Sequence, residues 1–323
     1  MDSNLKITFR GVRGSIPRPA SPKAIENKVR QALKLAAAKD LEDDESIDAF
    51  IKTLPWHTRG CAGGNTTCIQ VEAGDQHFIL DGGSGIIPIG QDWMKGDFGK
   101  GNGEAHILIT HTHIDHIIGF PMFTPFYIPG NRFTFYSPFP DLRERLAAQH
   151  DPRFFPVPLD ELRACLNFVD LSQTPELEIG DTTIRWHENH HPGRSFSYRV
   201  ERGGSSFILS TDSEYKDLSP QALAPTIEFF SNADLLIFDS QYGFTESVEL
   251  KRDWGHGSTF VGVDLALDAN IKSLALFHHE PSQEDDFLVA MLAKAQTYLK
   301  KMGGEDDLRV LLAQEGITID LGD

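Results

Sequence analysis

Short apolar runs recur along the whole chain and predict a protein rich in β-strands. They are either continuously apolar or alternate between apolar and polar residues, as buried and half-buried strands do. They cover residues 5–9, 67–72, 77–81, 105–110, 132–136, 183–186, 197–200, 206–211, 235–239 and 273–277. Because amphipathic helical stretches lie between and after these runs, the pattern predicts a layered α/β protein.

Helical periodicity is clearest in two stretches toward the end of the sequence. Apolar residues recur on one face over 260–267, and again over 287–298, with the spacing of an amphipathic helix. The second helix is predicted to begin at Ser282, because Asp285 follows three residues later in the pattern of a capping box.

Residues 20–55 look like an insertion between two strand-like parts. Ser21 and the proline after it mark a helix start, and apolar residues then recur at intervals of four from Ile25 to Leu33. The acidic stretch 40–45 interrupts this period, which resumes beyond it. The segment therefore predicts two helices, which could form a packed surface decoration, a lid or a dimer contact.

Composition is that of a globular protein with a large core. The chain has 323 residues, of which 40% are hydrophobic, enough for one elaborated domain or for two. No apolar run approaches the ~20 residues of a membrane-spanning helix, and the polar N-terminus leads into a strand rather than a secretion signal. The odd set of cysteines, Cys61, Cys68 and Cys165, contains no CxxC pair and predicts reduced thiols in a cytoplasmic protein.

A formal net charge of −17 constrains the partners. An acidic protein is poorly suited to long nucleic acids, whose phosphates are bound by Lys and Arg. A small anionic substrate stays compatible, because bound divalent metal ions reverse the local field. Otherwise the acidic excess is expected to serve solubility.

The segment 111–116, His-Thr-His-Ile-Asp-His, directly follows an apolar run and carries the most specific chemistry of the chain. Side chains alternate along an extended segment, so His111 and His113 can bind one metal ion together. Asp115 and His116 can then turn toward a second ion. Imidazole and carboxylate suit Zn²⁺ and related divalent metals, so this spacing predicts a metal site rather than a His-rich surface turn.

Later strands end in residues of the same type. His190 and His191, Asp212, and His278 with the histidine after it all follow apolar strands, where layered α/β proteins place their chemistry. Each residue alone is a weak indication, and the prediction depends on the whole set. Asp239 also ends such a strand and is expected to support the site rather than to bind metal. The histidines without this context are assigned no role: His57, His77, His106, His150 and His187.

A glycine-rich turn is expected beside the histidines. Asp81 follows a strand and begins the run Asp-Gly-Gly-Ser-Gly, where it could orient a metal-binding imidazole through the second ring nitrogen. The glycines would let backbone amides approach the metals or a phosphate oxygen, and Gly-Gly-Asn-Thr at 63–66 is expected to pack nearby.

The histidine motif, followed by a lone histidine, a lone aspartate and a final histidine, resembles the HxHxDH signature of the metallo-β-lactamase superfamily. The resemblance implies a four-layer αββα sandwich in a single hydrolase domain over 1–323, with 20–55 as a helical insertion and two metals in a shallow cleft between the sheets. His111, His113 and His191 would hold one metal, Asp115, His116 and His278 the other, and Asp212 would bridge them beside a hydroxide.

Two choices within this set rest on local context. His191 is preferred to His190 because it directly precedes Pro-Gly. His278 is preferred to His279 because it takes the first position after its strand.

Further motifs resemble the phosphodiesterase branch of this superfamily, which includes ribonuclease Z, cyclic-nucleotide phosphodiesterases and the cyclic phosphodiesterase of phosphonate breakdown. They are Gly-Val-Arg-Gly-Ser at 11–15, the glycine runs at 63–66 and 80–85, His-Pro-Gly at 191–193 and Gly-His-Gly-Ser-Thr at 255–259. The branch usually places serine directly after the histidine of the last motif, whereas Gly257 follows His256 here.

The resemblance implies a dinuclear metal-dependent phosphodiesterase that hydrolyses a small phosphodiester, with a 3′,5′-cyclic nucleotide as the leading substrate. A metal-bridging hydroxide would attack phosphorus, and His256 would protonate the leaving alkoxide, assisted by Asp81 or another carboxylate. Asp115 and His256 are the predicted catalytic residues. Zn²⁺ is the expected metal, with Mn²⁺ and Fe²⁺ as alternatives, and the branch suggests a homodimer.

Other functions fit the same metal site. A ribonuclease Z-like RNA 3′-end endonuclease would need a basic arm to grip tRNA, whereas region 140–165 mixes arginines with acids and is not glycine-rich. A carboxyl-ester, lactone or β-lactam hydrolase would use the metals to polarise a carbonyl, but has no evident need of the segment around His256. The intact ligand set argues against a metal-retaining scaffold that turns nothing over.

Overall fold

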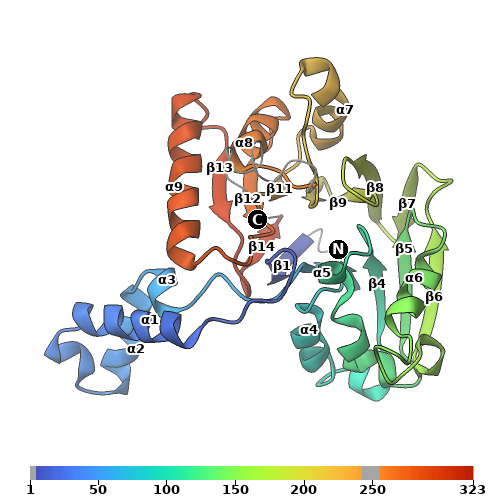
Figure 1. The fold of residues 1–323 in the computed structure, drawn as a ribbon, viewed down its shortest axis with the longest axis horizontal. Coiled ribbons are helices and arrows are strands. Elements are labelled where there is room, and N and C mark those ends of the chain that lie inside the picture. The colour runs from blue at the N-terminus through green and yellow to red at the C-terminus, as the bar shows by residue number, and fades with distance from the viewer. Residues whose placement is uncertain (1–4, 242–254, 323) are drawn as a thin grey trace.

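Two seven-stranded sheets face each other at the centre of the molecule, and helices cover their outer faces (Figure 1). The computed structural model describes residues 5–241 and 255–322. The predicted four-layer αββα sandwich is confirmed, and so are the ten predicted strands, each within a few residues of its expected position.

The first sheet is built mainly from the N-terminal half of the chain. Its spatial order is β14 (Thr318–Leu321), β1 (Leu5–Gly11), β2 (Cys68–Ala73), β3 (Gln76–Leu80), β4 (Glu104–Leu108), β5 (Arg132–Ser137) and β6 (Cys165–Asp170). Neighbours are antiparallel from β14 to β3 and parallel from β3 to β6.

The second sheet comes from the C-terminal half. Its order is β13 (Arg309–Leu312), β12 (Ser273–Phe277), β11 (Leu235–Asp239), β10 (Ser205–Ser210), β9 (Ser195–Arg202), β8 (Thr182–Asn189) and β7 (Glu176–Ile179). Strands β10 to β13 are parallel, and the hairpins from β7 to β10 are antiparallel. Parallel strands end at the same edge, so the residues that follow them can meet there.

Alternation along the strands divides the core into three apolar layers. Phe78 and Leu108 of the first sheet, with Phe207 and Phe277 of the second, belong to the buried cluster between the sheets. Their sequence neighbours point outward, where two further clusters form beneath the helices. Successive side chains of a strand point to opposite faces, so a strand covered on both faces is apolar at almost every position. Its sequence is therefore a continuous apolar run.

Helices pack on the outer face of each sheet. Side chains of α4 (Ile86–Trp93) and α6 (Leu142–Gln149) pack in the outer cluster of the first sheet, and those of α7 (Pro220–Phe230), α8 (Thr259–Asp268) and α9 (Asp285–Lys301) in that of the second.

One short helix, α5 (Ile114–Ile117), lies within the histidine motif. The 3₁₀ helices are η1 (Ala38–Leu41), η2 (Phe98–Lys100), η3 (Phe120–Met122), η4 (Thr124–Tyr127) and η5 (Leu159–Glu161). No helix in the described part of the chain combines the length and apolar character that a bilayer span requires.

Residues 20–55 form the predicted helices, which project from the body as an arm (Figure 1). Helix α1 (Pro22–Leu35) begins as expected, because the Ser21 side chain accepts a hydrogen bond from the backbone N–H of Ala24. Helix α2 (Asp44–Thr53) is capped in the same way by Asp43, and α3 (Trp56–Arg59) connects the arm to the body. No residue of α1 or α2 is buried.

Several predicted boundaries are shifted, and two of these shifts have a clear physical reason. Strand β4 ends at Leu108 rather than Thr110, because the chain already leaves the sheet to form the loop that holds the histidines. Helix α9 begins at Asp285 and not at Ser282, whose hydroxyl bonds Glu280 instead, so the capping box is absent. The buried face of α9 is also shifted, because Phe287 is 44% exposed and Leu288 takes its place in the core.

Among the described residues, four strands were not predicted, and they are the four edges of the two sheets: β6, β7, β13 and β14. Most of their side chains are half-buried or exposed. An edge strand has a neighbour on one side only and tolerates charge, so its apolar pattern is weak.

Candidate metal centre

Strand ends from both sheets bring seven of the predicted residues together at one edge of the sandwich. The loop after β4 and helix α5 supply four of them, and the ends of β8, β10 and β12 supply one each. They are His111, His113, Asp115, His116, His191, Asp212 and His278. All are buried except His113, which is exposed at the rim.

The first group consists of His111, His113, His191 and Asp212, whose ligand atoms all lie within 4.8 Å of one another. His113 Nδ1 and His191 Nε2 are 3.0 Å apart. Oδ2 of Asp212 lies 3.6 Å from His111 Nε2 and 3.7 Å from His191 Nε2. Three imidazoles and one carboxylate oxygen therefore converge, a donor set suited to a divalent transition metal.

The second group consists of Asp115, His116 and His278. Oδ2 of Asp115 lies 3.3 Å from His116 Nε2 and 3.2 Å from His278 Nε2. The other oxygen of Asp212, Oδ1, lies 3.1 Å and 3.3 Å from the same two nitrogens. Asp212 thus presents one oxygen to each group, the arrangement expected of a bridging carboxylate.

The far nitrogens of the imidazoles are held by neighbours that fix the ring orientation. His116 Nδ1 lies 2.8 Å from Asp81 Oδ2, and His191 Nδ1 lies 2.9 Å from the carbonyl oxygen of Gly255. By contrast, Nε2 of His111 and of His116 is buried and makes no hydrogen bond within residues 5–241 and 255–322. Buried imidazole nitrogens without partners, aimed at carboxylates, fit a metal ion between them.

Backbone strain is concentrated at the strand ends that supply the site. Asp81, Asp212 and His278 have φ values of 59°, 52° and 60°, in the left-handed region that favours glycine. Each such residue costs about 1–3 kcal/mol and persists where the surroundings fix it. This backbone conformation turns the three side chains away from the sheet and toward the metal centre.

Burial and charge set the protonation of the metal-free cluster. Burial holds the pKa of His111 well below its usual range, so this imidazole is neutral and able to bind a cation. Burial also opposes charge on His116, yet the carboxylates of Asp212, Asp115 and Asp81 together raise its pKa well above the usual range. A proton on His116 would compete with a metal, so binding is expected to release it.

His256 reaches the cluster despite the glycine that follows it, and forms a third metal-type group with Asp212 and His278. Its Nδ1 lies 3.0 Å from Asp239 Oδ2 and 3.8 Å from Asp212 Oδ2, and its ring stacks on that of His278. Burial lowers the pKa of His256, but Asp239 and the other carboxylates outweigh it and raise the pKa to about 9. The carboxylate that supports His256 is thus Asp239, not Asp81, which is engaged with His116 instead.

Gly257 has a structural role in this arrangement. Its backbone N–H donates to Asp239 Oδ2 at 3.2 Å, and a Cβ at this position would lie 2.7 Å from the carbonyl oxygen of Asp239. Only glycine allows this approach, which lets Asp239 bind both the imidazole and the backbone of the same segment. Ser258 still caps α8 through the N–H of Val261.

The two members of each histidine doublet lie in different surroundings. His190 is exposed, whereas His191 lies in the first group. His279 is buried, but its Nε2 faces the carbonyl oxygen of Ala313 at 3.0 Å, whereas His278 lies in the second group. The histidines to which no role was assigned are also absent from the metal-type clusters of the described residues.

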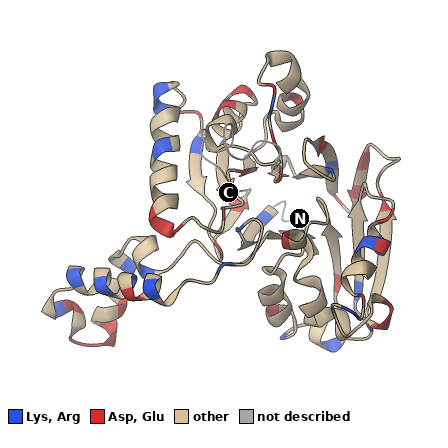
Figure 2. Ribbon diagram, in the orientation of Figure 1, with Lys and Arg blue, Asp and Glu red and all other residues tan. Residues whose placement is uncertain are grey.

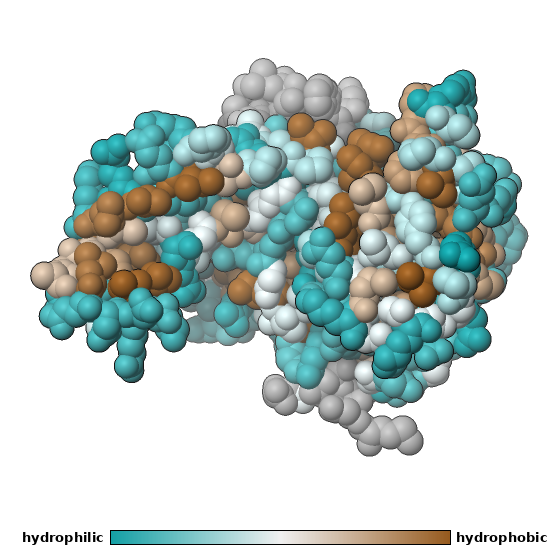
Figure 3. All heavy atoms as spheres, turned by 90° about the horizontal axis from the view of Figure 1, so that it is seen from below, coloured by the Kyte–Doolittle hydropathy of each residue, from teal (hydrophilic) through white to brown (hydrophobic). Residues whose placement is uncertain are grey.

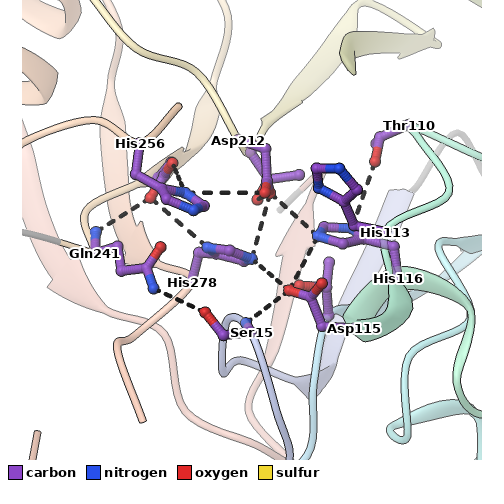
Figure 4. Close-up of polar contacts among 12 residues, drawn as sticks. Ser15, Thr110, His113, Asp115, His116, Asp212, Gln241, His256 and His278 are labelled. Carbon is purple, nitrogen blue, oxygen red and sulfur yellow. Dashed lines mark hydrogen bonds and ion pairs between the residues drawn. The ribbon is translucent and has the colours of Figure 1, made fainter. Parts of the chain in front are cut away.

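Two polar residues at the site were not predicted from the sequence. Ser15, in the loop after β1, contacts Asp115, and Gln241, just beyond β11, contacts Ser15 (Figure 4). The serine lies in the Gly-Val-Arg-Gly-Ser motif, but its partners are remote in sequence. Only the folded chain brings them together.

Comparison with known proteins agrees with this architecture. Residues 100–279 match the beta-lactamase superfamily domain. No curated protein matches the sequence. Among solved structures, the metallo-beta-lactamase fold protein YhfI from Bacillus subtilis is similar, with 17% identity, a TM-score of 0.64, and coverage of 98% of this chain and 99% of that one.

Two further structures are similar at comparable coverage. The short form of human tRNase Z has 15% identity and a TM-score of 0.56, over 97% of this chain and 98% of that one. Yeast PDE1 has 13% identity and a TM-score of 0.59, over 98% of this chain and 99% of that one. At these identities the likeness establishes the fold.

Proposed function

The chain belongs to the metallo-β-lactamase superfamily, and from that premise we propose that it is a phosphodiesterase acting on a small phosphodiester. The fold and the His/Asp groups around Asp212 support a metal-dependent hydrolase. The observation that carries the finer proposal is His256, a half-buried imidazole held by Asp239 directly beside Asp212. A 3′,5′-cyclic nucleotide is the leading substrate.

The seven clustered side chains would hold two divalent ions, with Zn²⁺ as the first choice and Mn²⁺ or Fe²⁺ as alternatives. Such ions lower the pKa of a bound water and withdraw charge from phosphoryl oxygens. Asp212 would hold both ions through its two oxygens. Asp115 would fix the second ion while its own position is maintained by the backbone N–H of Ser15, 2.7 Å away.

His256 would act on the leaving group. Cleavage of a phosphodiester releases an alkoxide, which needs a proton, and general-acid help of this kind contributes about 10²–10⁴-fold in rate. Asp239 orients the ring through Nδ1 and stabilises its protonated form, the state in which a general acid begins its step. Acyl hydrolysis gives no comparable reason for this second, carboxylate-supported imidazole.

A small substrate is favoured over RNA. The net charge of −17 opposes the binding of a long polyanion, whereas a single diester can be held by the metals alone. The similarity to tRNase Z makes precursor tRNA the alternative substrate to be tested beside the small diesters.

The test is hydrolysis of bis(p-nitrophenyl) phosphate by protein of measured metal content, with p-nitrophenyl acetate and a β-lactam in parallel. We expect diester turnover that is lost on chelation and restored by Zn²⁺ or Mn²⁺, followed by turnover in a cyclic-nucleotide screen. Ester or lactam turnover without diester turnover would contradict the proposal. Cleavage of precursor tRNA without turnover of small diesters would favour the nuclease.

We also propose that the chain forms a homodimer through the helical arm. Ile25, Val29 and Leu33 recur on one face of α1 and are 52%, 53% and 63% exposed. Figure 3 shows apolar residues in rows along the arm. An amphipathic helix whose apolar stripe faces solvent is incomplete by itself.

Charge complementarity favours a second copy of the chain as the partner. The exposed charges of α1 include Lys23, Arg30 and Lys34, whereas the segment 40–45 at the far end of the arm is acidic (Figure 2). In a two-fold symmetric, antiparallel pairing of two arms, the basic helix of each copy would lie against the acidic end of the other. The acidic end would be repelled by an anionic membrane surface.

A further inference from the structure

Ser15 lies at the rim of the metal centre, in the loop that follows β1. Its backbone N–H donates to Asp115 Oδ2 at 2.7 Å, and its hydroxyl oxygen accepts a hydrogen bond from Gln241 Nε2 at 3.1 Å (Figure 4). Asp115 and Gln241 are buried, whereas Ser15 is exposed. An exposed hydroxyl is therefore fixed between a buried metal-type carboxylate and a buried amide.

The hydroxyl proton has no acceptor in the described part of the protein. Because the amide N–H of Gln241 donates to the oxygen, the serine hydrogen points elsewhere, and no hydrogen bond of residues 5–241 and 255–322 uses it. A hydroxyl that accepts one hydrogen bond becomes a better donor of the next. Ser15 thus offers a donor beside the metal centre.

The surrounding backbone holds this donor rigidly. Ser15 has a φ of 61°, a strained value for a residue with a side chain. The N–H of Gly14 donates to the carbonyl oxygen of His279 at 3.0 Å, and Arg13 donates to the carbonyl oxygens of Gly63 and Gln283, both at 2.9 Å. The strain persists because these contacts fix the loop, as expected for a preorganised binding group.

Gln241 is anchored to the same framework. The side-chain amide of Gln283 donates to its carbonyl oxygen at 2.9 Å, and its own N–H donates to Asp239 Oδ1 at 3.1 Å. The aspartate that supports His256 therefore also positions the residue that orients Ser15. Asp239 thus links the hydroxyl of Ser15, through Gln241, to the imidazole of His256, the proposed general acid.

We propose that the Ser15 hydroxyl, oriented by Gln241, donates a hydrogen bond to a non-bridging phosphoryl oxygen of the substrate. The inference rests on the proposed function for its substrate class, but it predicts more generally a binding group for phosphate oxygens. The contact to Asp115 comes from the backbone, so Ser15→Ala removes the hydroxyl and leaves the support of the carboxylate in place.

The experiment compares Ser15→Ala with the wild type in three measurements: metal content, kcat/KM for bis(p-nitrophenyl) phosphate, and the affinity of the metal-loaded protein for inorganic phosphate. We expect unchanged metal content, with kcat/KM and phosphate affinity each reduced by about 10-fold or more, as for a lost hydrogen bond to a charged group. Ser15→Gly should show the same losses, although it relieves the backbone strain. Ser172→Ala, at an exposed serine remote in sequence, is the matched control.

A second variant tests the orientation by Gln241. Gln241→Leu should lower the phosphate affinity, and the double variant with Ser15→Ala should bind no more weakly than Ser15→Ala alone, because both changes disable one donor.

The outcomes separate the inference from the proposed function. Wild-type turnover of the diester with an equally active Ser15→Ala variant that binds phosphate normally would overturn the role of Ser15 and leave the function standing. Absence of diester turnover in the wild type, with weakened phosphate binding in Ser15→Ala, would reject the function and support the binding group.

Discussion

Oδ2 of Asp239 lies 3.0 Å from Nδ1 of His256, so the end of β11 supports an imidazole that lies beyond residues 242–254 in the sequence. The same oxygen accepts the backbone N–H of Gly257. One buried carboxylate therefore fixes both the ring and the backbone of this segment, and it does so without belonging to any metal-type group of the described residues.

His256→Ala should reduce diester turnover by about 10²–10⁴-fold while metal content stays unchanged, because the variant removes the proposed acid and leaves all seven proposed metal ligands in place, although His256 also forms a metal-type group with Asp212 and His278. Asp239→Asn should reduce turnover in the same direction, since the amide orients the ring without stabilising its charge. Steady-state kinetics with metal analysis by mass spectrometry provide the measurement. His190→Ala, at an exposed histidine, is the control. A fully active His256→Ala enzyme would refute the assigned role.

Asp212→Ala should lower the metal content more than any single histidine substitution, because its two oxygens face both groups. His191→Ala should affect the first group alone, whereas His190→Ala should leave metal binding intact. Metal stoichiometry after dialysis against a weak chelator distinguishes these variants. Equal metal content in Asp212→Ala and His191→Ala would argue against a bridging role.

Asp81 supports one imidazole of the candidate metal centre, that of His116. Its contacts with His116 and with the N–H and hydroxyl of Thr110 hold the His116 ring from behind. Asp81→Ala should weaken metal affinity by about 10–100-fold, as for other residues that orient a metal-binding imidazole. A competition titration with a chromophoric chelator measures this change. An unchanged affinity would show that the fold alone orients His116.

His150 predicts a pH dependence of stability away from the metal centre. It is buried, its Nδ1 faces the carbonyl oxygen of Val157 at 3.0 Å, and burial lowers its pKa. In the unfolded chain His150 has a pKa of about 6.5, whereas in the folded protein its pKa is lower. Below about pH 6.5 the unfolded chain therefore binds a proton that the folded protein does not, and the free energy of unfolding decreases as pH falls. His150→Gln should therefore lose less thermal stability than the wild type between pH 7.5 and 5.5. An equal fall in melting temperature for the two proteins between pH 7.5 and 5.5 would contradict this prediction.

Local sequence patterns predicted the interior of the fold and the candidate metal residues for the same physical reason. Inner strands are buried on both faces, so their apolar runs are continuous, and the side chains that follow parallel strands must meet at one edge. The edge strands, such as β6 and β14, carry charges and half-exposed side chains, and gave no comparable signal.

Contacts between distant segments could not be predicted in this way. Ser15 and Gln241 are 226 residues apart, and Asp239 reaches His256 only because Gly257 allows the backbone to approach. The sequence marks each of these residues as polar and near a strand end. Which of them become partners depends on how the two sheets pack, and no local pattern encodes that.

The helical arm leads to a prediction that does not depend on the proposed catalytic activity. If two copies pair through the stripe of Ile25, Val29 and Leu33, then Val29→Asp combined with Leu33→Asp places charge at the centre of the interface and should convert a dimer to a monomer. Leu218→Asp, at a residue 48% exposed elsewhere on the surface, is the matched control and should remain dimeric. Sedimentation equilibrium measures the association.

The charge pattern adds a second test of the same interface. Pairing of basic α1 with the acidic end of the partner's arm predicts that association weakens as salt is raised, because exposed ion pairs are screened. Pairing driven by the apolar stripe alone would be insensitive to salt or strengthened by it. Wild-type protein that is monomeric at all accessible concentrations would reject the proposed dimer, and a dimer that survives the double substitution would place its interface elsewhere than on α1.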